Sequence, residues 1–197
     1  MGKKVLVISS SLRHRSNSEM LAAEVARGAR DAGHTVEMVS LRDVDFSFCK
    51  GCLACQARGD GHCVMRDDAD ALAQKMAKAD VLVLATPVYY YGISGQLKAL
   101  LDRANPLYGQ DNAFGDVYLL ATAAEPGERV FERSIVCLEG WLDCFPGAKL
   151  AGSVLAGGGS KDPARPSAQR RRCRKRIAWA RPSSRNHRHR KMGPSHV

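Results

Sequence analysis

Five short apolar runs, separated by segments with helical periodicity, constrain the fold of this 197-residue chain more than any other feature. The most informative run, Asp80–Thr86, is apolar without alternation, which is typical of a strand covered on both faces of a parallel sheet. The other strands are expected at Lys4–Ser9, Thr35–Ser40, Val117–Thr122 and Ala151–Ala156. Strands that alternate with helices through short connections predict an α/β fold, a doubly wound five-stranded parallel sheet in one domain.

Four helices are expected between these strands, and capping residues mark the starts of several of them. The apolar pattern of the first helix begins at Met20, and Asp67 or Asp68 caps the second. Ser94 caps the third helix, and the fourth stops at Pro146. The segment between the second strand and the second helix is rich in glycine and polar residues, and it is expected to be a long loop.

The loop after the first strand has the composition of a phosphate site. It is rich in hydroxyls and contains an asparagine and two arginines, and a helix follows it. Free N–H groups and the dipole at such a helix start bind anions. The glycine-rich nucleotide motifs do not occur in this loop, and a Ser/Asn cradle suits the terminal phosphate of a mononucleotide better than a pyrophosphate. The alternative is that Ser16–Ser18 only caps the helix.

Three loops are expected to meet at one edge of the sheet, because ligands bind beyond the carboxyl ends of the strands, where the strand order switches. They are Ser9–Ser18, Thr86–Gly95 and Thr122–Gly127. The second loop has three consecutive tyrosines at 89–91, and at least one is expected to face the crevice and stack on a planar ligand. The alternative for each tyrosine is packing at a subunit interface. Convergence of the loops favours the phosphate site over a cap alone.

Three segments together resemble the NAD(P)H-dependent FMN reductases, a family with a flavodoxin-like fold. They are Ser9-Ser10-Ser11-Leu12-Arg13…Ser16-Asn17-Ser18, Thr86-Pro87-Val88-Tyr89…Ser94-Gly95-Gln96-Leu97-Lys98…Asp102-Arg103, and Ala121-Thr122-Ala123-Ala124. The resemblance covers about residues 3–157 and departs from the family at Ser10, where glycine is usual. It implies FMN as the cofactor and NAD(P)H as the co-substrate, with electrons passing to a quinone or another small acceptor. The flavin carries the chemistry, so no catalytic acid or base is implied.

The resemblance also implies which residues bind FMN. The phosphate would be held by Ser11, Arg13, Ser16, Asn17 and Ser18, and Ser9 of the same segment is counted with them. The flavin ring would be bordered by Pro87, Val88, Tyr89, Tyr90 and Gly92, with Thr122 and Ala123 near its pyrimidine edge. Family members are commonly homodimers or homotetramers, so an oligomer is expected.

Four of the seven cysteines lie within fifteen residues, and this clustering indicates a metal-binding or redox-active segment rather than a disulfide framework. They are Cys49, Cys52, Cys55 and Cys63. The spacing can surround a [4Fe-4S] cluster, and it resembles the motif of iron–sulfur flavoproteins, so an electron carrier with ferredoxin-like partners is the alternative function. A bare thiol loop, a zinc site and a labile disulfide remain open, and His62 is either a substitute ligand or solvent-facing. Cys137 and Cys144 are expected in the core of the fourth helix.

The net charge of +10 is concentrated at the C-terminal end. Residues 157–197 hold 13 of the 30 lysines and arginines but one of the 20 acidic residues, which gives them +12 and the remainder −2. Residues 1–157 are expected to form the FMN-binding domain, and 158–197 a basic, disordered tail. Because family members continue with an apolar-striped helix, the tail is interpreted as the product of a reading-frame shift near Gly158–Ser160, with the final helix missing or replaced. A genuine tail that binds nucleic acid is the rival interpretation.

Composition also bounds where the protein works. The apolar run after Lys4 has only four residues, too few for a secretory leader, and no run reaches the length of a membrane span. A cytoplasmic protein without a membrane partner is therefore expected. A nucleic-acid partner is disfavoured, because the charge of the globular part is close to neutral.

Overall fold

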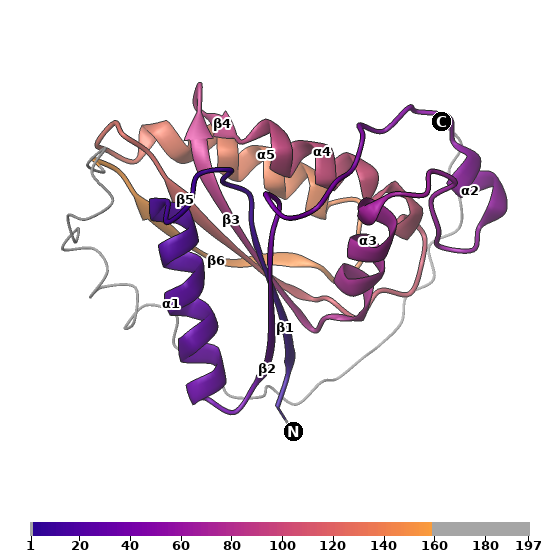
Figure 1. The fold of residues 1–197 in the computed structure, drawn as a ribbon, viewed down its shortest axis with the longest axis horizontal. Coiled ribbons are helices and arrows are strands. Elements are labelled where there is room, and N and C mark those ends of the chain that lie inside the picture. The colour runs from indigo at the N-terminus through magenta and orange to yellow at the C-terminus, as the bar shows by residue number, and fades with distance from the viewer. Residues whose placement is uncertain (1, 159–197) are drawn as a thin grey trace.

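The computed structural model describes residues 2–158. Five parallel strands form the main sheet in the order β2-β1-β3-β5-β6, which is the order of flavodoxin-like folds (Figure 1). They are β1 (Lys4–Ser9), β2 (Thr35–Ser40), β3 (Val81–Tyr89), β5 (Asp116–Thr122) and β6 (Lys149–Ala156). The predicted doubly wound sheet is confirmed, and its strand order changes direction between β1 and β3.

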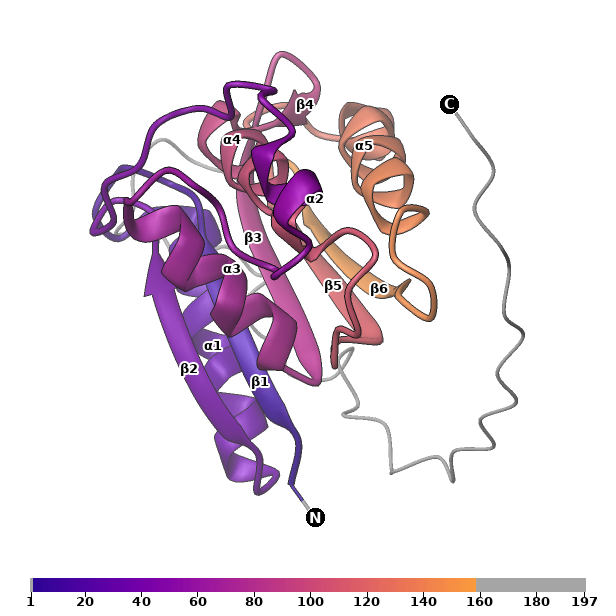
Figure 2. The ribbon, with the colours of Figure 1, turned by 90° about the vertical axis from the view of Figure 1, so that its right-hand side faces the viewer.

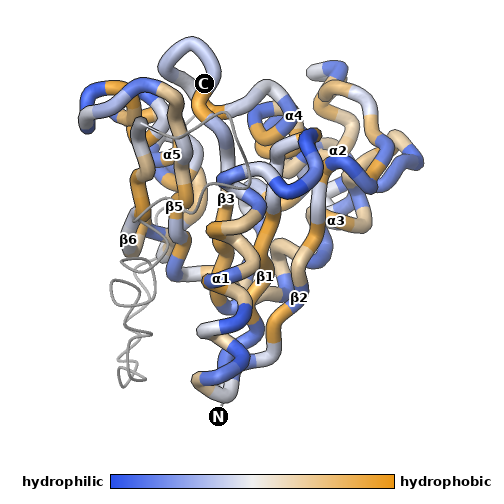
Figure 3. Tube along the Cα trace, turned by 60° about the vertical axis from the view of Figure 1, so that its left-hand side comes forward, coloured by the Kyte–Doolittle hydropathy of each residue, from blue (hydrophilic) through white to orange (hydrophobic). Residues whose placement is uncertain are grey.

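In the described part of the chain, one helix covers one face of the sheet and three cover the other (Figure 2). The single helix is α1 (Asn17–Asp31), and the three are α3 (Asp68–Lys78), α4 (Gly95–Arg103) and α5 (Glu132–Leu142). Short 3₁₀ helices follow α4 and precede α5, at η1 (Asn105–Leu107) and η2 (Arg129–Phe131). β3 is buried on both faces, since Leu82 packs with α3–α5 and Val83 with α1, as its non-alternating pattern predicts. In Figure 3, hydrophobic residues follow the central strands and the connecting turns are largely hydrophilic.

Side-chain caps start three helices where the sequence places them. In each case an oxygen accepts a backbone N–H two or three residues later: Ser16 from Glu19 (3.2 Å), Asp67 from Ala69 (3.2 Å) and Ser94 from Leu97 (3.3 Å). The apolar pattern of the first helix begins at Met20, and the Ser16 cap lets α1 begin three residues earlier, at Asn17.

Two segments expected to be loops contain regular structure. A five-residue helix, α2 (Ala54–Arg58), forms within the cysteine segment and ends at Gly59, whose φ of 64° is left-handed. β3 continues to Tyr89 and turns back into a short antiparallel strand, β4 (Gly92–Ile93). Both residues of the turn adopt positive φ, 49° and 65°, which bulky side chains rarely do. Local propensity therefore gave no signal for this hairpin.

The described residues end just after β6. Gly158 still belongs to the fold, because its N–H donates to the carbonyl of Glu125 (3.1 Å). The rest of the predicted basic tail, with its frameshift interpretation and the question of a final helix, lies outside the described residues. Within residues 2–158, no helix is long and apolar enough to cross a membrane.

Candidate functional site

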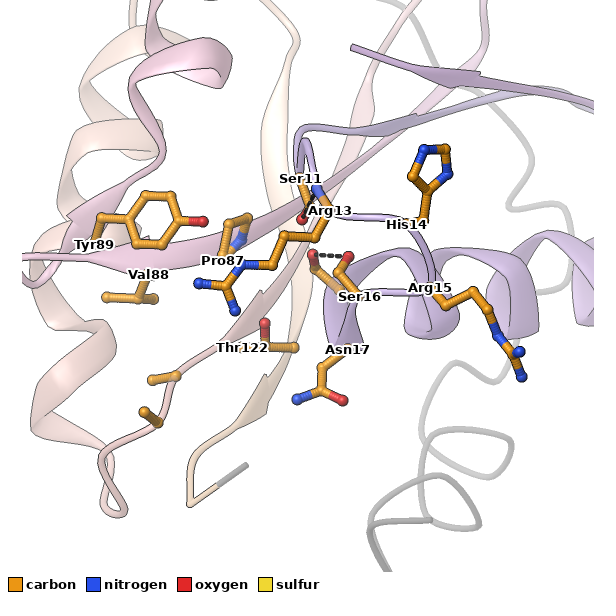
Figure 4. Close-up of a pocket in the computed structure, with 13 residues that line it drawn as sticks. Ser11, Arg13, His14, Arg15, Ser16, Asn17, Pro87, Val88, Tyr89 and Thr122 are labelled. Carbon is orange, nitrogen blue, oxygen red and sulfur yellow. Dashed lines mark hydrogen bonds between the residues drawn. The ribbon is translucent and has the colours of Figure 1, made fainter. Parts of the chain in front are cut away.

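A cavity of about 260 Å3 lies at the carboxyl ends of β1, β3 and β5 (Figure 4). Its walls come from the β1–α1 loop and from the ends of β3 and β5, so the three loops predicted to converge do so. The lining residues are Ser11, Arg13, His14, Arg15, Ser16, Asn17, Ser18, Pro87, Val88, Tyr89, Thr122, Ala123 and Ala124.

The β1–α1 loop forms a polar cradle at one end of this cavity. The backbone N–H of Arg13 donates to Ser11 Oγ (3.3 Å), and the Oγ atoms of Ser16 and Ser18 lie 3.3 Å apart. Ser16 caps α1 and also lines the cavity, so the two alternatives for this loop are compatible. Figure 4 shows the Arg13 side chain extending from the loop toward β3. A guanidinium, several hydroxyls and a helix N-terminus together suit a phosphate.

A buried hydroxyl network fixes this cradle against the neighbouring strand. Ser10 Oγ donates to the carbonyl of Ala85 (3.1 Å), and Ser94 Oγ donates to Ser10 Oγ (2.8 Å). The N–H of Ser94 donates to Thr86 Oγ1 (2.9 Å). The Ser10 side chain therefore links the β1–α1 loop to β3 and to the start of α4.

The other end of the cavity has the character of a ring site. Pro87, Val88 and Tyr89 offer largely apolar surface from the end of β3. Thr122 and Ala123 line the cavity from the end of β5 and bring a hydroxyl and backbone groups. A flat, partly polar ring linked to a phosphate matches this combination of surfaces.

Three of the predicted FMN-binding residues do not line the cavity: Ser9, Tyr90 and Gly92. Ser9 is buried in β1, and Tyr90 is fully exposed at the tip of the hairpin. The cavity adds three residues that sequence reasoning missed, His14, Arg15 and Ala124. Ala124 ends a matched segment and could have been found, whereas His14 and Arg15 are brought to the cavity by a turn in which Arg15 has a positive φ of 54°.

A sequence model described as NADPH-dependent FMN reductase matches residues 3–160. The chain belongs to this family. The family predicted from the three motif segments is therefore confirmed, and it is a flavin-binding family.

Relatives of this FMN reductase family member include iron–sulfur flavoproteins. One from Methanocaldococcus jannaschii is 39% identical over 104 residues, 53% of each chain, so the chain spans about half the length of that relative. One from Methanosarcina thermophila is 30% identical over 143 residues, 71% of this chain and 72% of the relative. The NAD(P)H:quinone oxidoreductase from Methanothermobacter marburgensis has a TM-score of 0.69 at 16% identity, over 95% of this chain and 100% of that chain, which shows the shared fold.

The cysteine segment of this family member lies beside the C-terminal end of α4. Its four thiols are free; Cys55 is buried, Cys63 is half-buried, and Cys49 and Cys52 are exposed. Asn105 donates a side-chain N–H to Cys55 Sγ (3.3 Å). Within residues 2–158, no group of three or more His, Cys, Asp or Glu side chains is arranged to hold a metal ion.

Arg103, at the end of α4, holds the cysteine segment in place. Its side chain is only 1% exposed and donates two hydrogen bonds to the Asp67 carboxylate (2.6 and 2.7 Å). It also donates to the carbonyl of Ser47 (2.7 Å) and to Cys63 Sγ (3.5 Å). One guanidinium therefore ties together both ends of the cysteine segment and the N-terminal cap of α3.

The ion pair between Asp67 and Arg103 predicts that the free energy of unfolding falls at acid pH. The hydrogen bonds from Arg103, opposed by burial and aided by the N–H of Ser47, hold the pKa of the Asp67 carboxyl below its usual range. The Asp67 carboxyl is therefore protonated at a higher pH in the unfolded chain than in the folded chain. Its contribution to the free energy of unfolding is complete above about pH 4, and it is lost as the pH falls through the lower pKa of the folded state. Urea unfolding at a series of pH values is expected to show a steeper acid loss for the native sequence than for Asp67→Asn. Equal slopes would contradict the assignment.

The remaining two described thiols, Cys137 and Cys144, and His62 lie outside the cluster of four cysteines. Cys137 is half-buried, and Cys144 is exposed in the turn after α5. The prediction that both lie in the helix core is wrong, because α5 ends at Leu142 and its buried face carries other side chains. His62 is exposed, and its Nδ1 lies 2.9 Å from Asp70, so the structure places it toward solvent rather than among the thiols.

Proposed function

We propose that the chain binds FMN in the 260 Å3 cavity and passes electrons from reduced nicotinamide dinucleotide to a small acceptor such as a quinone. The observation that carries this proposal is the cavity itself, in which a phosphate cradle at a helix start adjoins a largely apolar wall. When bound, FMN supplies the hydride and electron chemistry. The name of one relative, an FMN-dependent NADH:quinone oxidoreductase from Pseudomonas fluorescens, supports the choice of acceptor.

The residues of the chain would position the cofactor. Arg13 and the hydroxyls of the cradle would hold the phosphate, with the start of α1 adding its positive end. Tyr89 and its neighbours on β3 would cover one part of the ring, and Thr122 would meet its polar edge. The Ser10–Ser94 hydrogen bond keeps the cradle and the β3 wall at a fixed separation, so the site is pre-organised.

The proposal predicts a yellow protein that cycles between two spectra. Full-length protein incubated with FMN and passed through a desalting column should retain a visible flavin spectrum. Anaerobic addition of NADH or NADPH should bleach it, and a quinone should restore it. Protein that retains no FMN would contradict the proposal, and retained flavin that neither nucleotide bleaches would contradict the oxidoreductase part alone.

A second candidate function is electron transfer through an iron–sulfur cluster. The four free thiols have the right donor chemistry, Asn105 and Arg103 donate to two of the sulfurs, and two relatives are named iron–sulfur flavoproteins. The structure does not bring three of these thiols together, so ligation would require the segment to rearrange. Iron and sulfide assays on anaerobically purified protein decide the question, since absence of both leaves a thiol loop.

We also propose a homodimer or homotetramer. Tyr90 is fully exposed, and Phe48 and Leu53 are 78% and 62% exposed, which leaves large apolar side chains on the surface. Such side chains are enriched at interfaces. Light scattering tests the proposal, and a monomer at micromolar concentration would contradict it.

A further inference from the structure

A second cavity, of about 340 Å3, adjoins the proposed FMN cavity. Residues that are close neighbours in the chain line the two cavities: Ala124 lines the first and Glu125 the second, and Tyr89 lines the first and Tyr91 the second. The second cavity has no part in the proposed binding of FMN.

Two arginines give the second cavity its character. Arg129 and Arg133 both line it, and neither forms a salt bridge within residues 2–158. They flank the start of the 11-residue helix α5, whose N-terminus adds partial positive charge. Arginine is the residue best suited to bind phosphate, because its fork donates two parallel hydrogen bonds.

Two carboxylates also lie in this cavity, and their surroundings bear on its charge. Glu125 Oε2 accepts a hydrogen bond from Tyr91 Oη (2.9 Å), and Glu132 lies in the first turn of α5. The Arg133 guanidinium stands 5.8 Å from the centre of the Tyr91 ring. The strained positive φ of Tyr91 thus presents a ring that engages Glu125 and holds Arg133 in place.

We propose that the second cavity binds the 2′-phosphate of the reduced dinucleotide and so gives the protein a preference for NADPH over NADH. The proposal rests on the proposed function, since the nicotinamide must reach the flavin in the first cavity. The two cavities are lined by neighbouring residues of the chain, and the group that distinguishes NADPH from NADH is a phosphate of the kind that two arginines bind. Glu125 and Glu132 lower the affinity for that phosphate, so neutralising Glu125 should raise it.

The test compares two mononucleotides that differ only in the 2′-phosphate, adenosine 2′,5′-bisphosphate and 5′-AMP. Calorimetric titration of the full chain, reconstituted with FMN, should show about tenfold or tighter binding of the bisphosphate. Arg129→Gln combined with Arg133→Gln should remove this difference, and Glu125→Gln should enlarge it. Arg27→Gln, which alters an exposed arginine on α1 paired with Glu24, is the matched control and should change neither affinity.

Flavin reduction gives a second readout. In stopped-flow experiments the double arginine variant should need about tenfold more NADPH for half-maximal reduction, while the limiting rate and the response to NADH are unchanged. Equal binding of the two mononucleotides to the native protein, or a double variant that still discriminates, would overturn the proposal. Failure to bind FMN would contradict the proposed function instead. In that case the same mononucleotide titration on the full chain without flavin still tests the second cavity.

Discussion

Replacing Arg103 with methionine is expected to lower the free energy of unfolding by about 3–5 kcal/mol. The substitution keeps much of the side-chain volume but removes every donor, which leaves the partly buried Asp67 carboxylate without its bidentate partner and the Ser47 carbonyl without its donor. An uncompensated charge of this kind costs far more than the pair contributes. Urea unfolding followed by circular dichroism measures the loss.

The same helix supplies the control. Lys98 pairs with Asp102 at 2.6 Å, but both side chains are about half exposed, so Lys98→Met should cost less than about 1 kcal/mol. If Arg103→Met proves too unstable to study, the double variant with Asp67→Asn should recover part of the stability, because asparagine still caps α3 and no buried charge remains. Similar small losses for Arg103→Met and Lys98→Met would show that the buried pair is not the anchor of the cysteine segment.

Sequence patterns could predict the strands because a strand buried on both faces is an apolar run without alternation. Asp80–Thr86 has that pattern, and β3 lies at the centre of the sheet. Arg103 has no such pattern, since a basic residue in the last turn of a helix is usually solvated. Its burial depends on Asp67, 36 positions away, and only the folded chain shows the two together.

The candidate site likewise has one part that the sequence could predict and one part that it could not. The cradle could be predicted because a cap and a phosphate site use the same residue types in the same order, and Ser16 serves in both roles. The hairpin of β3 and β4 could not, because its turn relies on tyrosines with positive φ. That turn removes Tyr90 from the cavity and sends Tyr91 to the neighbouring one. The second cavity was therefore invisible from sequence.

Changing Asn17 to aspartate is expected to weaken FMN binding by about 10- to 100-fold while leaving the apoprotein as stable as before or slightly more stable. Asn17 is the first residue of α1 and lines the cavity. A carboxylate in the first turn of a helix is favourable by about 0.3–1 kcal/mol. The same carboxylate would repel a phosphate dianion in the cradle, by about 1–3 kcal/mol at close range in partly buried surroundings. Fluorescence titration with FMN and thermal unfolding of the apoprotein measure the two effects.

Riboflavin is the control ligand for this prediction, because it carries the same ring without the phosphate. If the cradle holds the phosphate, Asn17→Asp should leave riboflavin affinity within about twofold and weaken only FMN, and Arg13→Gln should do the same by removing a charged hydrogen-bond donor. Equal weakening of both flavins would mean that the substitution distorts the ring site. Unchanged FMN affinity in both variants would place the phosphate elsewhere, and the β1–α1 loop would then be a helix cap alone. The opposite signs expected for apoprotein stability and FMN affinity separate these outcomes, since a damaged helix start would lower both.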